Sequence, residues 1–248
     1  MALPFRLNSS GYERPETYSH KRLSQDASYR MAQLFPRTAD MWLRLALLLL
    51  SLGLVGVFAA FVILSRSSYV TDQGWTVHQP VPFSHEHHAG ALQIDCRYCH
   101  DNVETSPVAG LPPTHTCMSC HSQIWTGAEM LAPVRQSLVQ GEPLRWNRVT
   151  ELPDYVFFHH GVHVNAGVGC AECHGPVDRM PLMYKAEPFT MSWCLDCHQD
   201  PAPRLRPREA VTDMSWQYKG DRRELGEALM RKYHIGEGNL THCYTCHR

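Results

Sequence analysis

All ten cysteines of the chain stand in five C-x-x-C-H motifs, in which a histidine directly follows the second cysteine. This spacing is the attachment signature of c-type haem: both thiols form thioether bonds to the porphyrin edge, and the histidine becomes the proximal iron ligand. Zinc sites, thioredoxin-like redox pairs and disulfides also use C-x-x-C, but none of them requires the histidine. Five motifs therefore predict five covalently bound haems, numbered here as sites 1 to 5 in chain order. The predicted cofactor-binding residues are Cys96, Cys99, Cys117, Cys120, Cys170, Cys173, Cys194, Cys197, Cys243 and Cys246, and the predicted proximal ligands are His100, His121, His174, His198 and His247.

A haem iron that carries electrons without binding substrate needs a second axial ligand. Two segments with the pattern F-x-H-x-x-H precede the motifs of sites 1 and 3, in "FSHEHHAGALQIDCRYCH" and "FHHGVHVNAGVGCAECH". The two histidines of each pattern lie three residues apart and project to one side of a helix or turn, so they can serve two neighbouring haems. The predicted distal ligands are His85, His88, His160 and His163. We expect His87 and His159, one residue off the pattern, to support the sites rather than ligate.

Four distal histidines leave one haem without a second ligand. Met191, in "FTMSWCLDCH", is one candidate, and His234, at the end of the predicted helix "DRRELGEALMRKYH", is the other. Thioether ligation would raise the reduction potential relative to two histidines, so the choice decides whether one haem is an electron sink. His242 and His115, next to cysteine motifs, are weaker candidates, and the alternatives stay open.

Short elements must position these ligands. Because five macrocycles would supply much of the buried apolar surface, we expect short helices and irregular segments with little sheet. Two haem motifs follow each F-x-H-x-x-H segment, with first cysteines 21 residues apart at Cys96 and Cys117 and 24 apart at Cys170 and Cys194, which indicates two dihaem modules in tandem. The predicted organisation is a dihaem module over about 79–125, a partly helical connector over 126–153, a second module over 154–202 and a fifth-haem segment over 203–248. Arg204, Arg206 and Arg208 could neutralise haem propionates or dock a partner, but we expect a loop that faces water.

One segment is apolar enough to cross a bilayer. The run from Leu45 to Leu64 contains no charge, and twenty helical residues span about 30 Å, the thickness of the hydrocarbon core. The run starts later and is longer than the core of a cleaved signal peptide, and no A-x-A cleavage pattern follows it. We predict a cytoplasmic tail over 1–40 and a transmembrane signal anchor over 41–65.

The orientation of this anchor follows from charge. Seven lysines and arginines precede the apolar run, whereas Arg66 stands alone in the twenty residues after it. Positive charge stays in the cytoplasm, which places residues 66–248 on the periplasmic or outer face of a bacterial cytoplasmic membrane. Haem attachment to this motif also occurs outside that membrane. The formal net charge of −1 offers no basic surplus for binding nucleic acid.

The motif set resembles that of known cytochromes. The F-x-H-x-x-H and C-x-x-C-H arrangement is similar to class III multihaem c-type cytochromes. The combination of "GLPPTHTCMSCHSQIW", "FTMSWCLDCH" and a terminal "CYTCHR" behind one anchor resembles the pentahaem subunit of alternative complex III, a bacterial quinol-oxidising assembly. The resemblance implies a multihaem fold of short helices wrapped around haems. It also implies partners: an iron–sulfur, molybdopterin-oxidoreductase-like subunit, polytopic quinol-binding membrane subunits, a monohaem cytochrome c and a periplasmic electron acceptor.

Three functions fit these features. The first is an electron-transfer subunit that relays electrons from quinol, within a respiratory or photosynthetic complex, to the periplasmic acceptor. The second is a multihaem reductase with one open haem, and the third is a quinol dehydrogenase that oxidises quinol on its own haem. The supply of spare histidines favours the first. Because the sequence shows no nucleophile–base pair or phosphate-binding glycine loop, we predict no catalytic side chain.

Overall fold

The computed structural model describes residues 35–236 and 238–247. Helix α1, Ala39–Ser65, covers the predicted anchor segment, and its length and composition suffice to cross a membrane. None of its residues is buried, and one ion pair, Arg44 to Asp40, lies near its start. Most of the predicted cytoplasmic tail, residues 1–34, lies outside the described residues.

The haem-motif region belongs to a second compact unit, Val57–Arg248. Its described part contains short helices, irregular segments and two isolated β-bridges, Thr76 with Tyr184 and Val168 with Leu205, but no named strand. The α-helices are α2 (Ser68–Thr71), α3 (Cys96–Cys99), α4 (Thr114–His121), α5 (Ala132–Gln140), α6 (His160–Asn165), α7 (Cys170–His174), α8 (Met191–Gln199), α9 (Arg222–Tyr233) and α10 (Cys243–Cys246). A π-helix, η1 (Glu86–Ala91), and the 3-10 helices η2 (Glu129–Leu131), η3 (Val177–Arg179), η4 (Ala202–Arg204) and η5 (Arg208–Ala210) complete them.

Local signals in the sequence explain where the longer helices begin and end. The Asp221 carboxylate accepts hydrogen bonds from the backbone N–H groups of Arg223 and Glu224, which makes it the N-cap of α9. Gly141 follows α5 with φ of 70°, a left-handed conformation that glycine adopts without steric cost. Gly226 lets α9 approach η4 closely, because a Cβ atom there would overlap the Ala202 carbonyl.

The apolar core of the described region is small. One cluster joins Val81 to Leu131 and Val134, beside Cys117 and Met118 of α4. A second cluster contains Val103, Val164 and Val211. Such limited burial in a unit of this size agrees with the expectation that bound cofactors contribute apolar surface.

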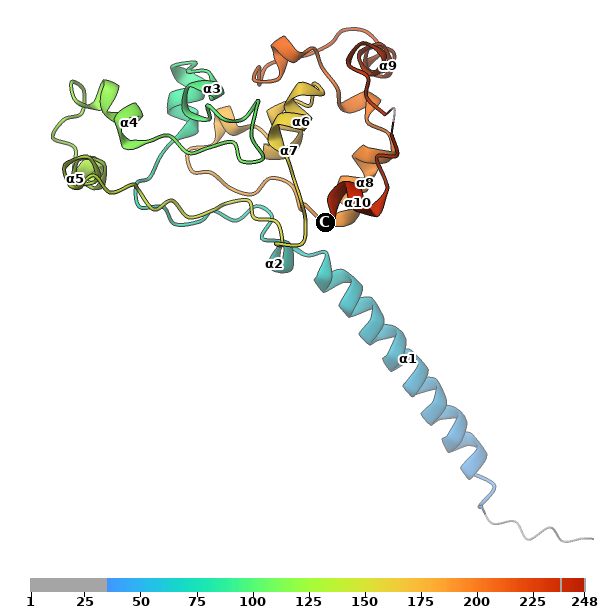
Figure 1. The fold of residues 1–248 in the computed structure, drawn as a ribbon. Coiled ribbons are helices and arrows are strands. Elements are labelled where there is room, and N and C mark those ends of the chain that lie inside the picture. Colours follow the sequence, from blue (N-terminus) through green and yellow to red (C-terminus); the bar gives the residue numbers. More distant parts are fainter. Residues whose placement is uncertain (1–34, 237, 248) are drawn as a thin grey trace, which may run out of the picture. The chain divides into compact units, whose positions relative to one another are not determined.

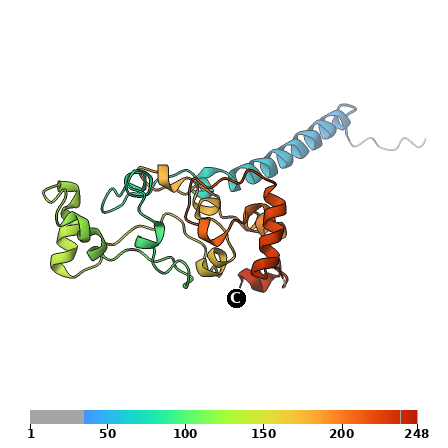
Figure 2. The same ribbon diagram turned by 90° about the horizontal axis from the view of Figure 1, so that it is seen from above.

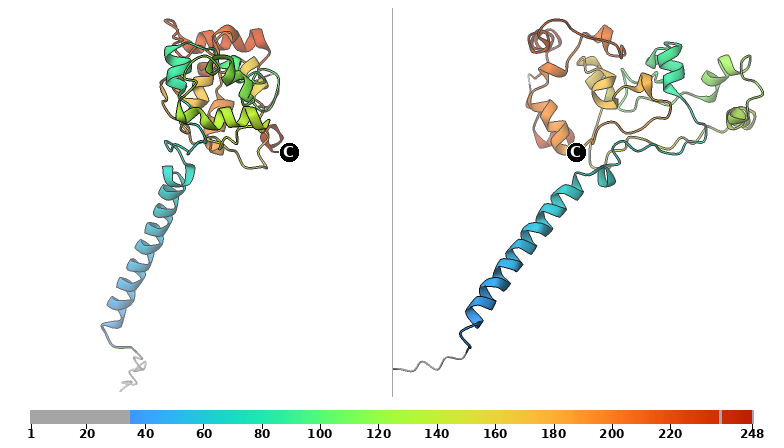
Figure 3. Two further views of the ribbon diagram at one scale, coloured as in Figure 1. Left: turned by 90° about the vertical axis from the view of Figure 1, so that its left-hand side faces the viewer. Right: turned by 180° about the vertical axis from the view of Figure 1, so that it is seen from behind.

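The motif helices form a row whose order differs from the order in the chain. Figure 1 shows α4 at one end, then α3, then α7, with α8 and α10 together at the other end. The view from above in Figure 2 and the view from behind in Figure 3 give the same order.

Candidate haem-binding sites

Each C-x-x-C-H motif forms a short helix or the end of one. In a helix, residues three apart lie on one face, so both cysteines of a motif point to the same side. The N-caps of three of these helices are polar side chains that bind a backbone N–H of the first turn: Asp95 for α3, Thr190 for α8 and His242 for α10. The helices thus present two thiols and a trailing imidazole together, as attachment of haem requires.

Three predicted distal histidines face predicted proximal histidines. The ring centres are 6.3 Å apart for His88 and His121, 6.3 Å for His160 and His174, and 6.0 Å for His163 and His198. Each F-x-H-x-x-H segment therefore places a candidate distal histidine opposite a proximal histidine of the module that follows it in the chain.

These separations are those that a shared metal would require. A metal–imidazole bond is about 2.0–2.1 Å, and the bonded nitrogen lies about 1.1 Å from its ring centre, so two imidazoles on opposite sides of one metal have centres about 6.3 Å apart. The three pairs therefore fit the two axial positions of one haem iron each.

Hydrogen bonds orient the imidazoles for ligation. The Nδ1 atoms of four proximal histidines lie within hydrogen-bond distance of backbone carbonyls: His100 at 2.8 Å from Gly110, His121 at 3.2 Å from Ile124, His198 at 2.8 Å from Leu240 and His247 at 3.1 Å from Tyr155. The distal histidines follow the same rule, with His88 at 2.8 Å from Ser84, His160 at 2.7 Å from Pro107 and His163 at 2.9 Å from His159. An Nδ1–H that donates to a carbonyl leaves Nε2 unprotonated, which is the tautomer that binds metal through Nε2.

In site 1, His85 is a close neighbour of His100. Burial, together with the nearby imidazoles of His100 and His88, lowers the pKa of His85 to about 4. Burial also lowers the pKa of His174 to about 4, with contributions from His160, His100 and His85. Both rings are therefore neutral at pH 7, as a metal ligand must be.

No role was predicted for the phenylalanines of the two F-x-H-x-x-H segments. Phe83 stacks on His88 at 4.3 Å and meets His85 edge-on at 4.9 Å. Phe158 repeats this arrangement, 4.5 Å from His163 and 4.8 Å edge-on to His160. Each phenyl ring thus fixes two candidate distal ligands at once, and the duplicated aromatic residue was the sequence signal for it.

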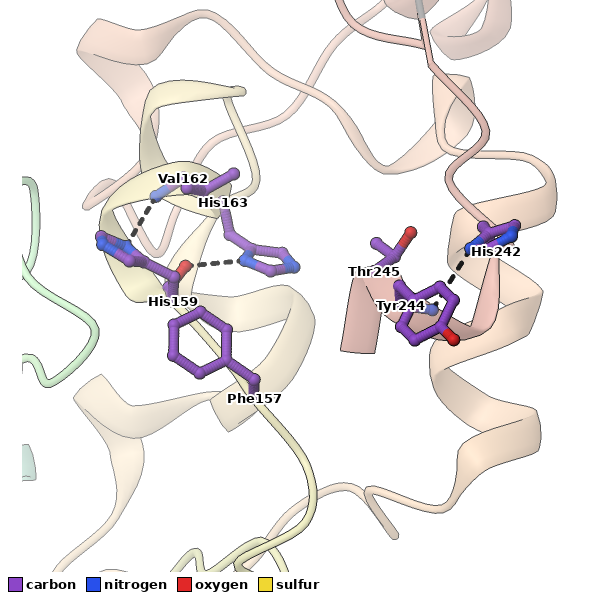
Figure 4. Close-up of a pocket in the computed structure, with 7 residues that line it drawn as sticks. All are labelled: Phe157, His159, Val162, His163, His242, Tyr244 and Thr245. Carbon is purple, nitrogen blue, oxygen red and sulfur yellow. Dashed lines mark hydrogen bonds between the residues drawn. The ribbon is translucent and has the colours of Figure 1, made fainter. Parts of the chain in front are cut away.

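Other histidines have supporting positions. His159 is the N-cap of α6 and accepts a hydrogen bond at Nδ1 from the Val162 N–H. His87 stacks on Trp125 at 5.9 Å. His163 points into a cavity of about 570 Å³ that has His242 and Tyr244 on its other side, and His159 also lines this cavity although its ring points away (Figure 4). This cavity lies beside the His163 ring, where site 4 needs room for its cofactor.

Site 5 is less complete than the others. His247 lies 5.9 Å from the Tyr155 ring, and the Phe157 N–H donates to the Cys246 carbonyl at 2.6 Å. Met191 is the first residue of α8 and is 65% exposed. His234 ends α9 with φ of 57° and lines a cavity of about 380 Å³. The choice between them as fifth distal ligand stays a prediction.

The expectation of a water-facing arginine loop is wrong for Arg206. Its side chain is 6% exposed and binds Glu172, inside the site 3 motif, at 3.0 Å. Arg222 binds the same carboxylate at 3.1 Å, and Arg204, which is 55% exposed, binds it at 3.5 Å. Arg206 is buried because its guanidinium also lies 4.9 Å from the Trp216 ring. Sequence reasoning missed this pairing because its partners are far apart in the chain.

Comparison with known proteins agrees with this chemistry. No family model matches the chain. The chain is similar to a protein of Nitratidesulfovibrio vulgaris named "Menaquinone reductase, multiheme cytochrome c subunit": the two are 28% identical over 182 residues, which cover 68% of this chain and 77% of that protein. The similarity supports a multihaem cytochrome c. It also supports c-type haems as the cofactors and a place among other subunits.

Proposed function

We propose that this chain is a membrane-anchored pentahaem cytochrome c that relays electrons within a quinol-linked complex, with alternative complex III as the specific assignment. The observation that carries this proposal is the set of three imidazole pairs at 6.0–6.3 Å. A pair that occupies both axial positions leaves no place for substrate, which suits electron transfer rather than catalysis.

The chain's own residues have three tasks in this function. The cysteines fix each cofactor covalently, and the imidazoles fill both axial positions. The backbone carbonyls and the rings of Phe83 and Phe158 hold those imidazoles in place. When bound, haem supplies one-electron chemistry, and the surrounding burial and hydrogen bonds set its potential.

The anchor and partners complete the proposal. Helix α1 would hold the haem region at the outer face of the cytoplasmic membrane, with the N-terminus inside. One such helix makes a poor quinol pocket, so the polytopic and iron–sulfur partners implied by the resemblance would handle quinol. A monohaem cytochrome or another periplasmic acceptor would receive the electrons.

A second candidate reverses the direction of flow. The name of the similar protein describes reduction of menaquinone, so a quinone-reducing complex would use the same row of haems in the opposite sense. A reductase with an open haem is the third candidate, and site 5 is where it would reside.

Purification of the tagged protein from its native membrane in mild detergent, followed by mass spectrometry, tests the assignment. We expect molybdopterin-like and polytopic subunits to co-purify and the complex to oxidise menaquinol with a cytochrome acceptor. The isolated subunit should not oxidise menaquinol, and robust turnover by it alone would refute the need for partners. Net reduction of menaquinone by the complex would select the second candidate.

A further inference from the structure

The two dihaem modules exchange equivalent contacts. Aligning their motifs equates residues 83–94 with 158–169 and residues 96–107 with 170–181. The Glu86 N–H donates to the Met180 carbonyl at 3.0 Å, and the Gly161 N–H donates to the Ser106 carbonyl at 3.1 Å. Glu86 is equivalent to Gly161 and Met180 is equivalent to Ser106, so one hydrogen bond is the image of the other.

A second pair of contacts repeats this exchange. Asn165 Nδ2 donates to the Glu104 carbonyl at 2.8 Å. The equivalent Gly90 lies so close to Asp178, the equivalent of Glu104, that a Cβ atom would overlap the Asp178 carbonyl. Reciprocal contacts between equivalent residues are the mark of a two-fold axis.

Equivalent groups meet at the centre of this arrangement. Cys96 and Cys170, the first cysteines of sites 1 and 3, lie in contact with each other. The loop after site 1 also contacts a site 3 ligand, because the Pro107 carbonyl binds His160 Nδ1 at 2.7 Å. The equivalent atom, His85 Nδ1, is buried without a hydrogen-bond partner. Sites 1 and 3 are therefore the junction between the modules.

The remaining neighbours complete a linear order. Site 2 lies next to site 1, because Phe83 contacts both His85 and His88. Phe158 joins sites 3 and 4 in the same way. Site 5 adjoins site 4, because the carbonyl of Leu240, three residues before Cys243, lies 2.8 Å from His198 Nδ1.

We propose that the two modules pair about a pseudo-two-fold axis, so that electrons pass through the sites in the order 2–1–3–4–5. This proposal rests on the proposed function as an electron relay. Sites 2 and 5 are then the two ends at which electrons enter and leave, and site 1 is an internal position although its motif comes first in the chain. Figure 1 shows the corresponding helices α4, α3, α7, α8 and α10 along the row.

Iron positions in a cryo-electron microscopy map of the detergent-solubilised native complex test this order. We expect the irons nearest to site 1 to be those of sites 2 and 3, and the irons nearest to site 3 to be those of sites 1 and 4. A map in which the iron of site 2 is nearer to site 3 than the iron of site 1 would overturn the order while leaving the relay function intact. A map with fewer than five haems would instead refute the proposed function.

Two glycines at the junction allow a test in solution. Gly90→Ala and Gly161→Ala each place a methyl group against a carbonyl of the other module, at 2.7 Å from Glu104 O for Gly161. Gly127→Ala is the matched control, because a Cβ atom there would meet nothing within 4 Å. We expect the same two haems, those of sites 1 and 3, to change midpoint potential and low-spin EPR signal in both junction variants, with five haems retained and the control unchanged. Shifts confined to different haems in the two variants would contradict the shared junction.

Discussion

Replacing His163 gives a direct test of axial ligation. Its ring is 6.0 Å from that of His198, stacks on Phe158 at 4.5 Å and borders the 570 Å³ cavity. His163→Ala would remove the ligand from one side of site 4 and leave the proximal side intact. We therefore expect one haem in five to become five-coordinate and the other four to remain low-spin.

The assay follows from the open coordination position. The ferric His163→Ala protein should show a high-spin signal for about one haem per chain, and the reduced protein should bind about one carbon monoxide per chain. Added imidazole should restore the low-spin form, because the cavity next to residue 163 can admit it. His163→Met should stay six-coordinate and raise the potential of this haem.

His159→Ala is the matched control. The His159 side chain caps α6, and alanine keeps the backbone carbonyl that binds His163 Nδ1, so this substitution should cost about 1 kcal/mol of stability and produce no high-spin haem. Ligation by His163 would be refuted if His163→Ala bound no carbon monoxide, or if both variants bound it equally.

Two further predictions concern the charged groups around the sites. Arg206, whose side chain is 6% exposed, is an ion-pair partner of Glu172, and Arg206→Ala should lower the free energy of unfolding by about 3 kcal/mol. Arg204, which binds the same carboxylate, is 55% exposed, so Arg204→Ala should lower it by less than about 1 kcal/mol. Thermal unfolding measures both, and equal losses would contradict the burial argument. Hydrogen bonds from Arg97 hold the pKa of Asp95 at about 2, below its value in the unfolded chain, so the carboxylate stabilises the fold above about pH 4 and loses this effect as pH falls toward 2. Because Asp95 is 44% exposed, Asp95→Asn, which keeps the N-cap, should lower stability by only about 0.5–1 kcal/mol at pH 7 in urea unfolding, and the difference should shrink below pH 4.

The candidate ligands could be predicted from the sequence, but the groups that orient them could not. Cysteines and histidines at fixed spacing can be recognised in the sequence itself, and Asp221 at the start of the predicted helix indicated where α9 begins. The groups that orient the histidines are backbone carbonyls, such as Pro107 and Leu240, at sequence separations of 53 and 42 residues from the histidines they bind. A carbonyl belongs to every residue, so no residue type reveals it.

The spatial order of the sites was hidden for a related reason. The repeat was recognised from spacing, and a tandem repeat by itself favours neighbours in chain order. The structure instead pairs equivalent faces, because Gly90 and Gly161 let two backbones approach each other. In the sequence, glycine at these positions indicates a turn. Its role in close backbone approach becomes clear only from the neighbouring carbonyls of Asp178 and Glu104.

The arrangement also explains why so small an apolar core suffices. The described core contains ten buried apolar residues, six of them in two clusters, which is too little to fix so many irregular segments by itself. An iron bound between each pair would engage both imidazoles, and a macrocycle fixed by two thioethers would supply apolar surface at the same place. We therefore expect cofactor attachment and folding to be coupled in this chain, with the paired rings at 6.0–6.3 Å as the points of coupling.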